Sequence, residues 1–303
     1  AKAFRELTPD IIRHLIINTI RSVRVKHGRE YGEVVICCDG KNYWRKKYNP
    51  YYKSGRKKAR DKMPYDMKMI YQTLDELKDE LNRYFPYKII EVEGAEADDV
   101  IGTICKELSN SFKILIYSSD KDFYQLQRYP NVSQISPMTK RFVEDDKTPD
   151  EYLFEHIIRG DSGDGVTNVF TDIDVLEREG VRQKRITGRF IQMLYNNGAF
   201  RMWKEGEDVK YIVEGTGIDP ARFELNVLMV DLSMTPPDIS EEICSKFRQK
   251  KKKPIGGWSS SLLRYFSKHK MKLLVECLDD FLFPLDYGEL KIKNSSSTIE
   301  IFS

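Results

Sequence analysis

Hydrophobic side chains at the start of the chain follow two successive patterns. Thr8-Pro9 has the form of a helix N-cap with a first helical residue, and apolar side chains at helical spacing follow up to Gly28, where we expect the helix to end. Residues 33–38 are instead a short, nearly continuous apolar run, which is typical of a strand covered on both faces of a parallel sheet. The opening segment therefore predicts a helix followed by a buried strand.

The same alternation continues toward the middle of the chain. Apolar residues at helical spacing over 67–81 and 100–108 alternate with strand-like runs at 87–92 and 112–117, and a weaker strand is expected at 132–135. Helices that alternate with strands indicate right-handed crossovers between parallel strands. The predicted fold class is α/β, with a mostly parallel central sheet flanked by helices.

The second half of the chain has a different pattern. Thr148-Pro149-Asp150-Glu151 is a capping box with proline at the first helical position, and mostly helical patterns follow it. Residues 294–297 have the composition of a linker, which leads to a short apolar end at 299–302. We therefore expect an α/β core over 1–147 and a mainly helical C-terminal region over 148–303.

Composition places the chain among ordinary globular proteins. Of its 303 residues, 40% are hydrophobic and 32% are charged, which excludes collagen-like, coiled-coil and largely disordered chains. No apolar run approaches the roughly 20 residues that span a bilayer, and the start of the sequence lacks the apolar core of a secretory signal. Five cysteines without zinc-like spacing favour a reducing environment, so we expect a cytoplasmic location and no membrane contact.

The net charge of +3 carries no information as a sum, but basic residues are concentrated in one segment. Residues 41–60 hold nine basic side chains, five aromatic ones and no acid. This combination suits single-stranded nucleic acid, because cations contact phosphates and aromatic faces stack on bases. A solvated positive loop is the alternative interpretation. Because the segment directly follows Asp39, we expect its cations to lie over the carboxylates described next.

Acidic residues follow the predicted strands one after another. The strands and the capping-box helix are each followed by carboxylates: Asp39, then Glu96, Asp98 and Asp99, then Asp120 and Asp122, then Asp161 and Asp164. The carboxyl ends of parallel strands meet at one edge of a sheet, so we expect these acids to converge. Bound Mg²⁺ or Mn²⁺ would relieve their mutual repulsion, and two such ions suit phosphodiester hydrolysis. Any single acid here also fits a loop or helix-capping residue.

Three acidic motifs, taken together, resemble those of the 5′-nuclease family, which comprises flap endonucleases and 5′-to-3′ exonucleases. They are Glu96-Ala97-Asp98-Asp99, Ser119-Asp120-Lys121-Asp122-Phe123 and Gly160-Asp161-Ser162-Gly163-Asp164-Gly165. Within the family, the residues from Asp39 through Tyr43-Trp44-Arg45, together with 223–232 and 280–283, look most like the ribonucleases H of T-even-type bacteriophages. The resemblance covers nearly the whole chain. It implies a PIN-like fold whose metal-binding core carries a basic helical arch at 41–64, and a duplex-binding C-terminal region with a helix-three-turn-helix.

The family resemblance also implies roles for individual residues. Two Mg²⁺ ions, for which Mn²⁺ can substitute, are implied near two groups of acids: Asp39, Glu96 and Asp98 for one, and Asp120, Asp122, Asp161 and Asp164 for the other. Asp99 is then a helix cap or a supporting residue. The arch implies catalytic roles for Arg45, Tyr52, Lys53 and Arg56. Nucleic-acid contacts are expected from Lys46, Lys47, Lys57, Lys58, Gly163, Gly165, Arg182, Lys184 and Arg185, and a K⁺ ion is expected at the helix-three-turn-helix.

Two features depart from the family pattern. After Asn168 the family usually has a glycine-rich hairpin, whereas this chain has Val169-Phe170-Thr171-Asp172, so duplex contacts are expected from the basic residues that follow. The family also begins with a strand that carries its first metal-binding Asp, whereas this sequence starts in the segment after such a strand. We expect that an N-terminal piece precedes the sequence; the alternative is a protein that lacks this ligand.

The sequence thus predicts a Mg²⁺-dependent 5′ nuclease that degrades RNA or DNA from 5′ ends on duplexes and cuts 5′ flaps, as in RNA primer removal during phage DNA replication. Expected partners are branched or duplex DNA and RNA–DNA, with a single-strand-binding protein or sliding clamp as candidate protein partners. The protein is expected to act as a monomer in the host cytoplasm. Two alternatives stay open: a non-catalytic, structure-specific DNA-binding relative, and a metal-dependent phosphatase, which would not need the basic arch.

Overall fold

A single mostly parallel sheet forms the centre of the computed structural model, which describes residues 7–56, 60–251, 254–282 and 297–302. Within these residues the strand order is β2-β1-β6-β3-β4-β5. The strands are β1 (Glu33–Cys37), β2 (Lys88–Ile90), β3 (Phe112–Tyr117), β4 (Val132–Ser136), β5 (Arg141–Phe142) and β6 (Ser297–Phe302). All neighbours are parallel except β4 and β5, which are antiparallel. The predicted α/β fold class is therefore confirmed.

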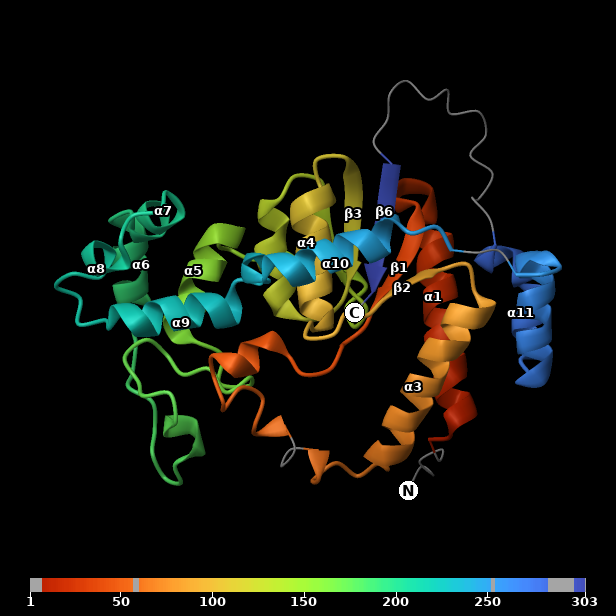
Figure 1. Ribbon diagram of the computed structural model, residues 1–303, viewed down its shortest axis with the longest axis horizontal. Helices are drawn as coiled ribbons and strands as arrows, with labels where there is room; N and C mark the ends of the chain where they lie inside the picture. Colours follow the sequence, from red (N-terminus) through yellow and green to blue (C-terminus); the bar gives the residue numbers. More distant parts are fainter. Residues whose placement is uncertain (1–6, 57–59, 252–253, 283–296, 303) are drawn as a thin grey trace.

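Helices cover both faces of the sheet (Figure 1). On one face, α4 (Ala97–Leu108) and α10 (Pro237–Arg248) form a buried cluster with residues of β1, β2 and β3. On the other face, α1 (Pro9–Tyr31), α3 (Met67–Tyr84), α11 (Gly257–Lys268) and α12 (Lys272–Glu276) form a second cluster around Val34. Successive side chains of a strand point to opposite faces, which is why β1 contributes Val35 to the first cluster and Val34 to the second.

The first helix is longer than predicted. Thr8 caps it as expected, since its hydroxyl accepts a hydrogen bond from the Ile11 amide at 3.4 Å. However, α1 continues past Gly28 and ends at Gly32, whose φ of 82° is a conformation that glycine adopts without a side-chain clash. Burial of Tyr31 against Leu115 explains the extension, because packing offsets the roughly 1 kcal/mol that a mid-helix glycine costs.

The sequence did not predict the C-terminal strand. Residues 297–302 form β6, which lies between β1 and β3 and pairs Ile301 with both Val35 and Ile116. The sequence favoured helices and a linker in this region, because a six-residue apolar end carries no local signal of distant strand partners. The last described residues thus belong to the same sheet as the first strand.

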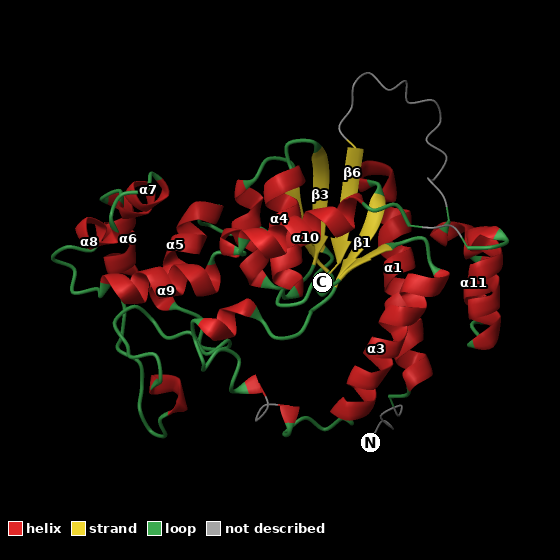
Figure 2. Ribbon diagram, viewed as in Figure 1, coloured by secondary structure: helices red, strands yellow, loops and turns green. Residues whose placement is uncertain are grey.

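Five helices form a separate lobe at one end of the sheet (Figure 2). They are α5 (Pro149–Arg159), α6 (Gly188–Asn196), α7 (Ala199–Lys204), α8 (Val209–Ile212) and α9 (Pro220–Val230), and they share a third buried cluster. The predicted capping box of α5 is present, with the Glu151 amide donating to the Thr148 hydroxyl at 3.2 Å. None of the helices in the described ranges is both long and apolar enough to span a bilayer.

Candidate active site

Four of the predicted carboxylates line one small cavity. Asp98 lies in the first turn of α4, Asp122 lies in the 3₁₀ helix η2 (Lys121–Arg128) that follows β3, and Asp161 and Asp164 lie in the loop after α5. The cavity measures about 20 Å³, which is room for about one water molecule or ion. The structure thus brings together acids from three segments, as expected for side chains that follow parallel strands.

Backbone hydrogen bonds orient the carboxylates of the loop after α5. Asp161 Oδ1 accepts hydrogen bonds from the amides of Gly163 at 2.8 Å and Asp164 at 3.3 Å. The loop turns tightly at Gly160, where φ is +66° and a Cβ atom would lie 2.5 Å from the Thr167 carbonyl oxygen. Only a glycine fits this approach, which brings both loop carboxylates to the cavity.

Burial and mutual repulsion raise the pKa of two cavity acids. The pKa of Asp98 is raised to about 8, chiefly by burial and further by the charges of Glu96 and Asp120, against the opposing effect of Lys53. The pKa of Asp122 is raised to about 7, again first by burial and then by the neighbouring aspartates. Negative charge in this cavity is therefore incompletely balanced by protein cations. The oxygen atoms of these four carboxylates fit a divalent cation such as Mg²⁺.

Asp39 and Asp120 are exposed and do not line the cavity. Asp39 Oδ1 accepts a hydrogen bond from the Ala97 amide at 2.9 Å and so caps the start of α4. Asp120 caps η2 through the Asp122 amide at 2.9 Å, and its charge also raises the pKa of Asp122. Both acids position the segments that carry the cavity carboxylates.

Glu96 is buried and is already paired with cations. Its Oε2 atom accepts a hydrogen bond from the Tyr52 hydroxyl at 2.8 Å and an ion pair from Arg45 Nη1 at 3.1 Å, while its Oε1 atom contacts Lys53 Nζ. Lys53 Nζ also lies 3.4 Å from Asp164 Oδ2. The predicted arch residues therefore reach the predicted metal ligands.

The base of the arch packs directly on the loop after α5. The Lys53 amide donates to the Asp164 carbonyl oxygen at 2.8 Å, and Arg56 Nη2 lies 2.5 Å from Asp164 Oδ1. A Cβ atom on Gly165, whose φ is +76°, would lie 2.4 Å from the Tyr51 carbonyl oxygen. Gly165 was predicted to contact nucleic acid, but its close neighbour is the arch. Its lack of a side chain permits this contact.

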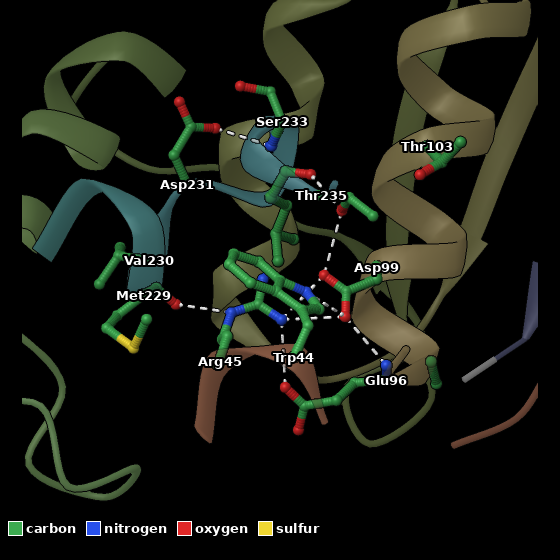
Figure 3. A network of polar contacts seen from close by, with 12 residues as sticks. Trp44, Arg45, Glu96, Asp99, Thr103, Met229, Val230, Asp231, Ser233 and Thr235 are labelled. Carbon is green, nitrogen blue, oxygen red and sulfur yellow. Dashed lines mark hydrogen bonds and ion pairs between the residues drawn. The ribbon is translucent and has the colours of Figure 1, made fainter. Parts of the chain in front are cut away.

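Arg45 is buried rather than placed at the gateway. Its side chain is 1% exposed, and its Nε atom donates to the Met229 carbonyl oxygen at 3.1 Å, while Nη1 donates to Glu96 and Asp99 (Figure 3). The burial of Arg45 could not be predicted from its neighbours, because the residue lies in a strongly basic segment. Arg45 joins the arch to α4 and to the end of α9, and it lines the cavity together with the carboxylates.

Asp99 is the centre of this buried network. Its Oδ2 atom accepts hydrogen bonds from the Glu96 amide at 2.9 Å and from Trp44 Nε1 at 3.2 Å, and its Oδ1 atom accepts one from the Thr235 hydroxyl at 3.1 Å (Figure 3). The bond to the Glu96 amide lies at the start of α4. The expectation that Asp99 is a helix cap or supporting residue is confirmed.

The predicted nucleic-acid contacts fall on several surfaces. Lys46 and Lys47 are exposed on the 3₁₀ helix η1 (Trp44–Lys47), whereas Lys57 and Lys58 lie outside the described residues. Gly163 is exposed, but its amide is used by Asp161. The remaining predicted residues are exposed on the loop between the 3₁₀ helix η3 (Val175–Glu177) and α6: Arg182, Lys184 and Arg185.

Asn168 fixes that basic loop. The Asn168 amide donates to Gln183 Oε1 at 2.7 Å, and Asn168 Nδ2 donates to the Lys184 carbonyl oxygen at 2.7 Å. The Lys184 amide in turn donates to the Thr171 hydroxyl at 3.0 Å. Asn168 and Thr171 thus hold the cationic loop beside the loop after α5.

His156 lies at the cavity and was not predicted from the sequence. It is in the last turn of α5, and one of its ring nitrogens lies within 4.8 Å of carboxylate oxygens of Asp122 and Asp161. The sequence feature that could have indicated His156 as a site residue is its position one helical turn before Gly160. However, a lone histidine on an amphipathic helix is a weaker candidate for a metal ligand than the many acids nearby.

Two family models match the chain. The 5′-3′ exonuclease N-terminal resolvase-like domain matches residues 10–153, and the T4 RNase H C-terminal domain matches residues 148–281. A ribonuclease H of Enterobacteria phage T4 is 31% identical over 278 residues, which cover 89% of this chain and 87% of that protein. A 5′-3′ exonuclease of Aquifex aeolicus (strain VF5) is 33% identical over 172 residues, which cover 51% of this chain and 55% of that protein.

Solved structures of similar fold come from bacteriophage T5. A flap endonuclease in a complex with DNA and metal ions has a TM-score of 0.56 and 20% identity, covering 78% of this chain and 92% of that one. A 5′-exonuclease with bound zinc has a TM-score of 0.53 and 20% identity, and the match covers 80% of this chain and 92% of that one. At this level of identity the likeness shows a shared fold.

Proposed function

Because this chain belongs to the family of 5′-3′ exonucleases and T4 ribonuclease H, we propose that it hydrolyses phosphodiesters of RNA or DNA at 5′ ends on duplexes. The substrates include 5′ flaps, and the proposed setting is RNA primer removal during phage DNA replication. One observation supports this most directly: Lys53 and Arg56 of the basic arch contact carboxylates of the acidic site. A site for small phosphate esters needs no such arch.

The proposed metal ligands are the four cavity acids and three acids next to the cavity. We assign them to two Mg²⁺ ions, with Mn²⁺ as a substitute: Asp39, Glu96 and Asp98 toward one, and Asp120, Asp122, Asp161 and Asp164 toward the other. Such ions, when bound, supply water activation and stabilisation of the leaving oxygen. The helix-capping bonds of Asp39 and Asp120 use Oδ1, which leaves Oδ2 of each carboxylate for an ion.

Two arch residues are proposed to act on the substrate, and two others are proposed to hold them in place. Lys53 and Arg56 are cations at the carboxylate site, and in the complex they would contact the phosphate where charge develops. Tyr52 is held by Glu96 and packs among the helices of the lobe, so it fixes the position of the neighbouring Lys53. Arg45 supports the arch from inside the fold.

The proposed duplex surface combines two groups of exposed cations. Lys46 and Lys47 lie on η1, and the loop fixed by Asn168 presents three more: Arg182, Lys184 and Arg185. Branched DNA and RNA–DNA are the proposed partners, with a K⁺ ion at the loop after α5. A single-strand-binding protein or a sliding clamp as protein partner, and action as a cytoplasmic monomer, belong to the same proposal.

A cleavage assay with matched substrates tests this function. The purified protein should cut a DNA duplex with a 5′ flap and shorten an annealed RNA from its 5′ end when Mg²⁺ is present. A duplex with a 3′ flap and blocked 5′ ends, and an EDTA-treated sample, are the controls, and both should stay intact. Structure-specific binding without any cleavage would favour the non-catalytic alternative, whereas hydrolysis confined to small phosphate esters would favour the phosphatase.

A further inference from the structure

His156 is a buried group for which the proposed reaction has no role. Its side chain is 16% exposed, and its ring lies beside Tyr152 with ring centroids 6.1 Å apart. The Nδ1 atom is buried and has no hydrogen-bond partner among the described residues. Buried polar atoms in proteins nearly always have a partner, so this atom needs one that the described residues do not provide.

The two ring nitrogens of His156 face two of the cavity carboxylates. Nδ1 lies 3.5 Å from Asp122 Oδ1, and Nε2 lies 4.0 Å from Asp161 Oδ2. Both distances are too long for hydrogen bonds. Two ligands that each lie about 2.1 Å from one ion are about 3.0–3.4 Å apart in octahedral or tetrahedral geometry. A metal ion takes one nitrogen of an imidazole. One ring nitrogen of His156 and one oxygen each of Asp122 and Asp161 lie within 4.8 Å of one another, so a small approach of these side chains gives the spacing that a shared ion requires.

We propose that His156, Asp122 and Asp161 form a mixed nitrogen–oxygen site for a divalent transition metal ion, for which Mn²⁺ is the probe. The proposal rests on the proposed function and deepens it, because it adds a nitrogen ligand to the ion that Asp122 and Asp161 hold. Mg²⁺ strongly prefers oxygen ligands, whereas imidazole nitrogen suits first-row transition ions. The site should therefore select Mn²⁺ over Mg²⁺ more strongly than a set of carboxylates alone.

The alternative role for His156 is that of an imidazolium ion paired with the two aspartates. An imidazolium has protons on both ring nitrogens and therefore no lone pair for a metal. The two roles consequently differ in a property that can be observed directly, which is a bond between nitrogen and the bound ion.

Pulsed electron paramagnetic resonance of the full chain with bound Mn²⁺, without nucleic acid, tests the site. The wild-type protein should show ¹⁴N modulation from a coordinated imidazole. His156→Gln should lose it and bind Mn²⁺ about 10-fold or more weakly, with a smaller loss of Mg²⁺ affinity. His156→Asp should keep ion binding, lose the modulation and shift the preference toward Mg²⁺. The matched control is His27→Gln, which should behave as wild type. His27 lies near the end of α1, beside Tyr31.

Two results would overturn the proposal: no ¹⁴N modulation in the wild-type protein, or equal losses of Mn²⁺ and Mg²⁺ affinity in His156→Gln. Urea unfolding in EDTA identifies a variant that fails to fold, and His156→Asp then decides in place of His156→Gln. Cleavage of a 5′ flap in Mg²⁺ is measured separately. A ¹⁴N signal in a protein that cleaves no substrate would refute the proposed nuclease function but support the proposed metal site. Cleavage without a ¹⁴N signal would support the nuclease function and refute the metal site.

Discussion

Asp98 and Asp99 are consecutive residues of α4, and the fold neutralises them in opposite ways. Asp99 is fully buried, but it has an arginine, an indole and a hydroxyl group as partners. Asp98 faces the cavity, where burial and other acids raise its pKa to about 8. Successive residues of a helix point about 100° apart, so one lies toward the network of Arg45 and the other toward the cavity.

This difference separates acids that hold the fold from acids that are available to a ligand. A buried carboxylate with internal partners is part of the structure, and removing a partner leaves an uncompensated charge. A buried carboxylate whose charge the protein leaves unbalanced is a candidate for function. Substitutions in the two groups should therefore change different measured quantities, stability in one and cleavage in the other.

The largest expected effect is loss of cleavage when a cavity acid is neutralised. Asp122→Asn and Asp164→Asn should each lower the cleavage rate of a 5′ flap by about a thousandfold or more, because the loss of an ion ligand removes several kcal/mol of transition-state stabilisation. Affinity for the duplex should change little, since phosphate contacts lie elsewhere. Undiminished Mg²⁺-dependent cleavage by both variants would contradict the assignment of these acids.

The Arg45 network should respond in stability instead. Arg45→Met leaves Glu96 and Asp99 as buried charges with fewer partners, so the free energy of unfolding should fall by about 3–5 kcal/mol in urea denaturation. Lys46→Met, at the exposed neighbouring position, is the control and should change it by less than about 0.5 kcal/mol. Equal stability of the Arg45→Met and wild-type proteins would remove the distinction between the two groups of acids.

The next largest effect is expected from the arch cations. Lys53→Ala combined with Arg56→Ala should lower the single-turnover cleavage rate by tens to thousands of fold, about 2–4 kcal/mol, if these side chains stabilise charge in the transition state. The rate is measured with enzyme in excess, so that weaker binding does not contribute. A double variant that cuts as fast as wild type under this condition would assign both cations to binding alone.

The sequence predicted the elements of this site better than the contacts between them. Strand ends, the capping box and the cavity acids follow from local patterns, since periodicity and chain order place acids at one edge of a parallel sheet. The burial of Arg45 could not be predicted, because it depends on the Met229 carbonyl oxygen 184 residues away. Strand β6 was missed for the same reason, since its partners β1 and β3 are distant in sequence.

The pH dependence of stability follows from the cavity acids. The folded protein holds protons on Asp98 and Asp122 at pH values where the unfolded chain, with aspartate pKa near 4, has lost them. The free energy of unfolding should therefore fall as pH rises from about 6.5 to 8, by about 1–2 kcal/mol in EDTA. Mg²⁺ should reduce the fall, because it stabilises the ionised carboxylates. Urea denaturation across this pH range measures the fall, and a free energy of unfolding that rises with pH would contradict the prediction.

The smallest expected effect comes from Lys46 and Lys47, which lie next to Arg45 on the same turn of η1. Arg45 is buried in η1, whereas Lys46 and Lys47 on the same turn are exposed, so Lys46→Ala combined with Lys47→Ala should leave stability and the single-turnover rate unchanged. Binding to a 5′-flap duplex should weaken several-fold, and the slope of log affinity against log salt should drop by up to about 2, one for each lost phosphate contact. A salt titration of the affinity measures this slope. An unchanged slope would show that the two lysines are solvated surface charges, and that the path of the duplex does not cross η1.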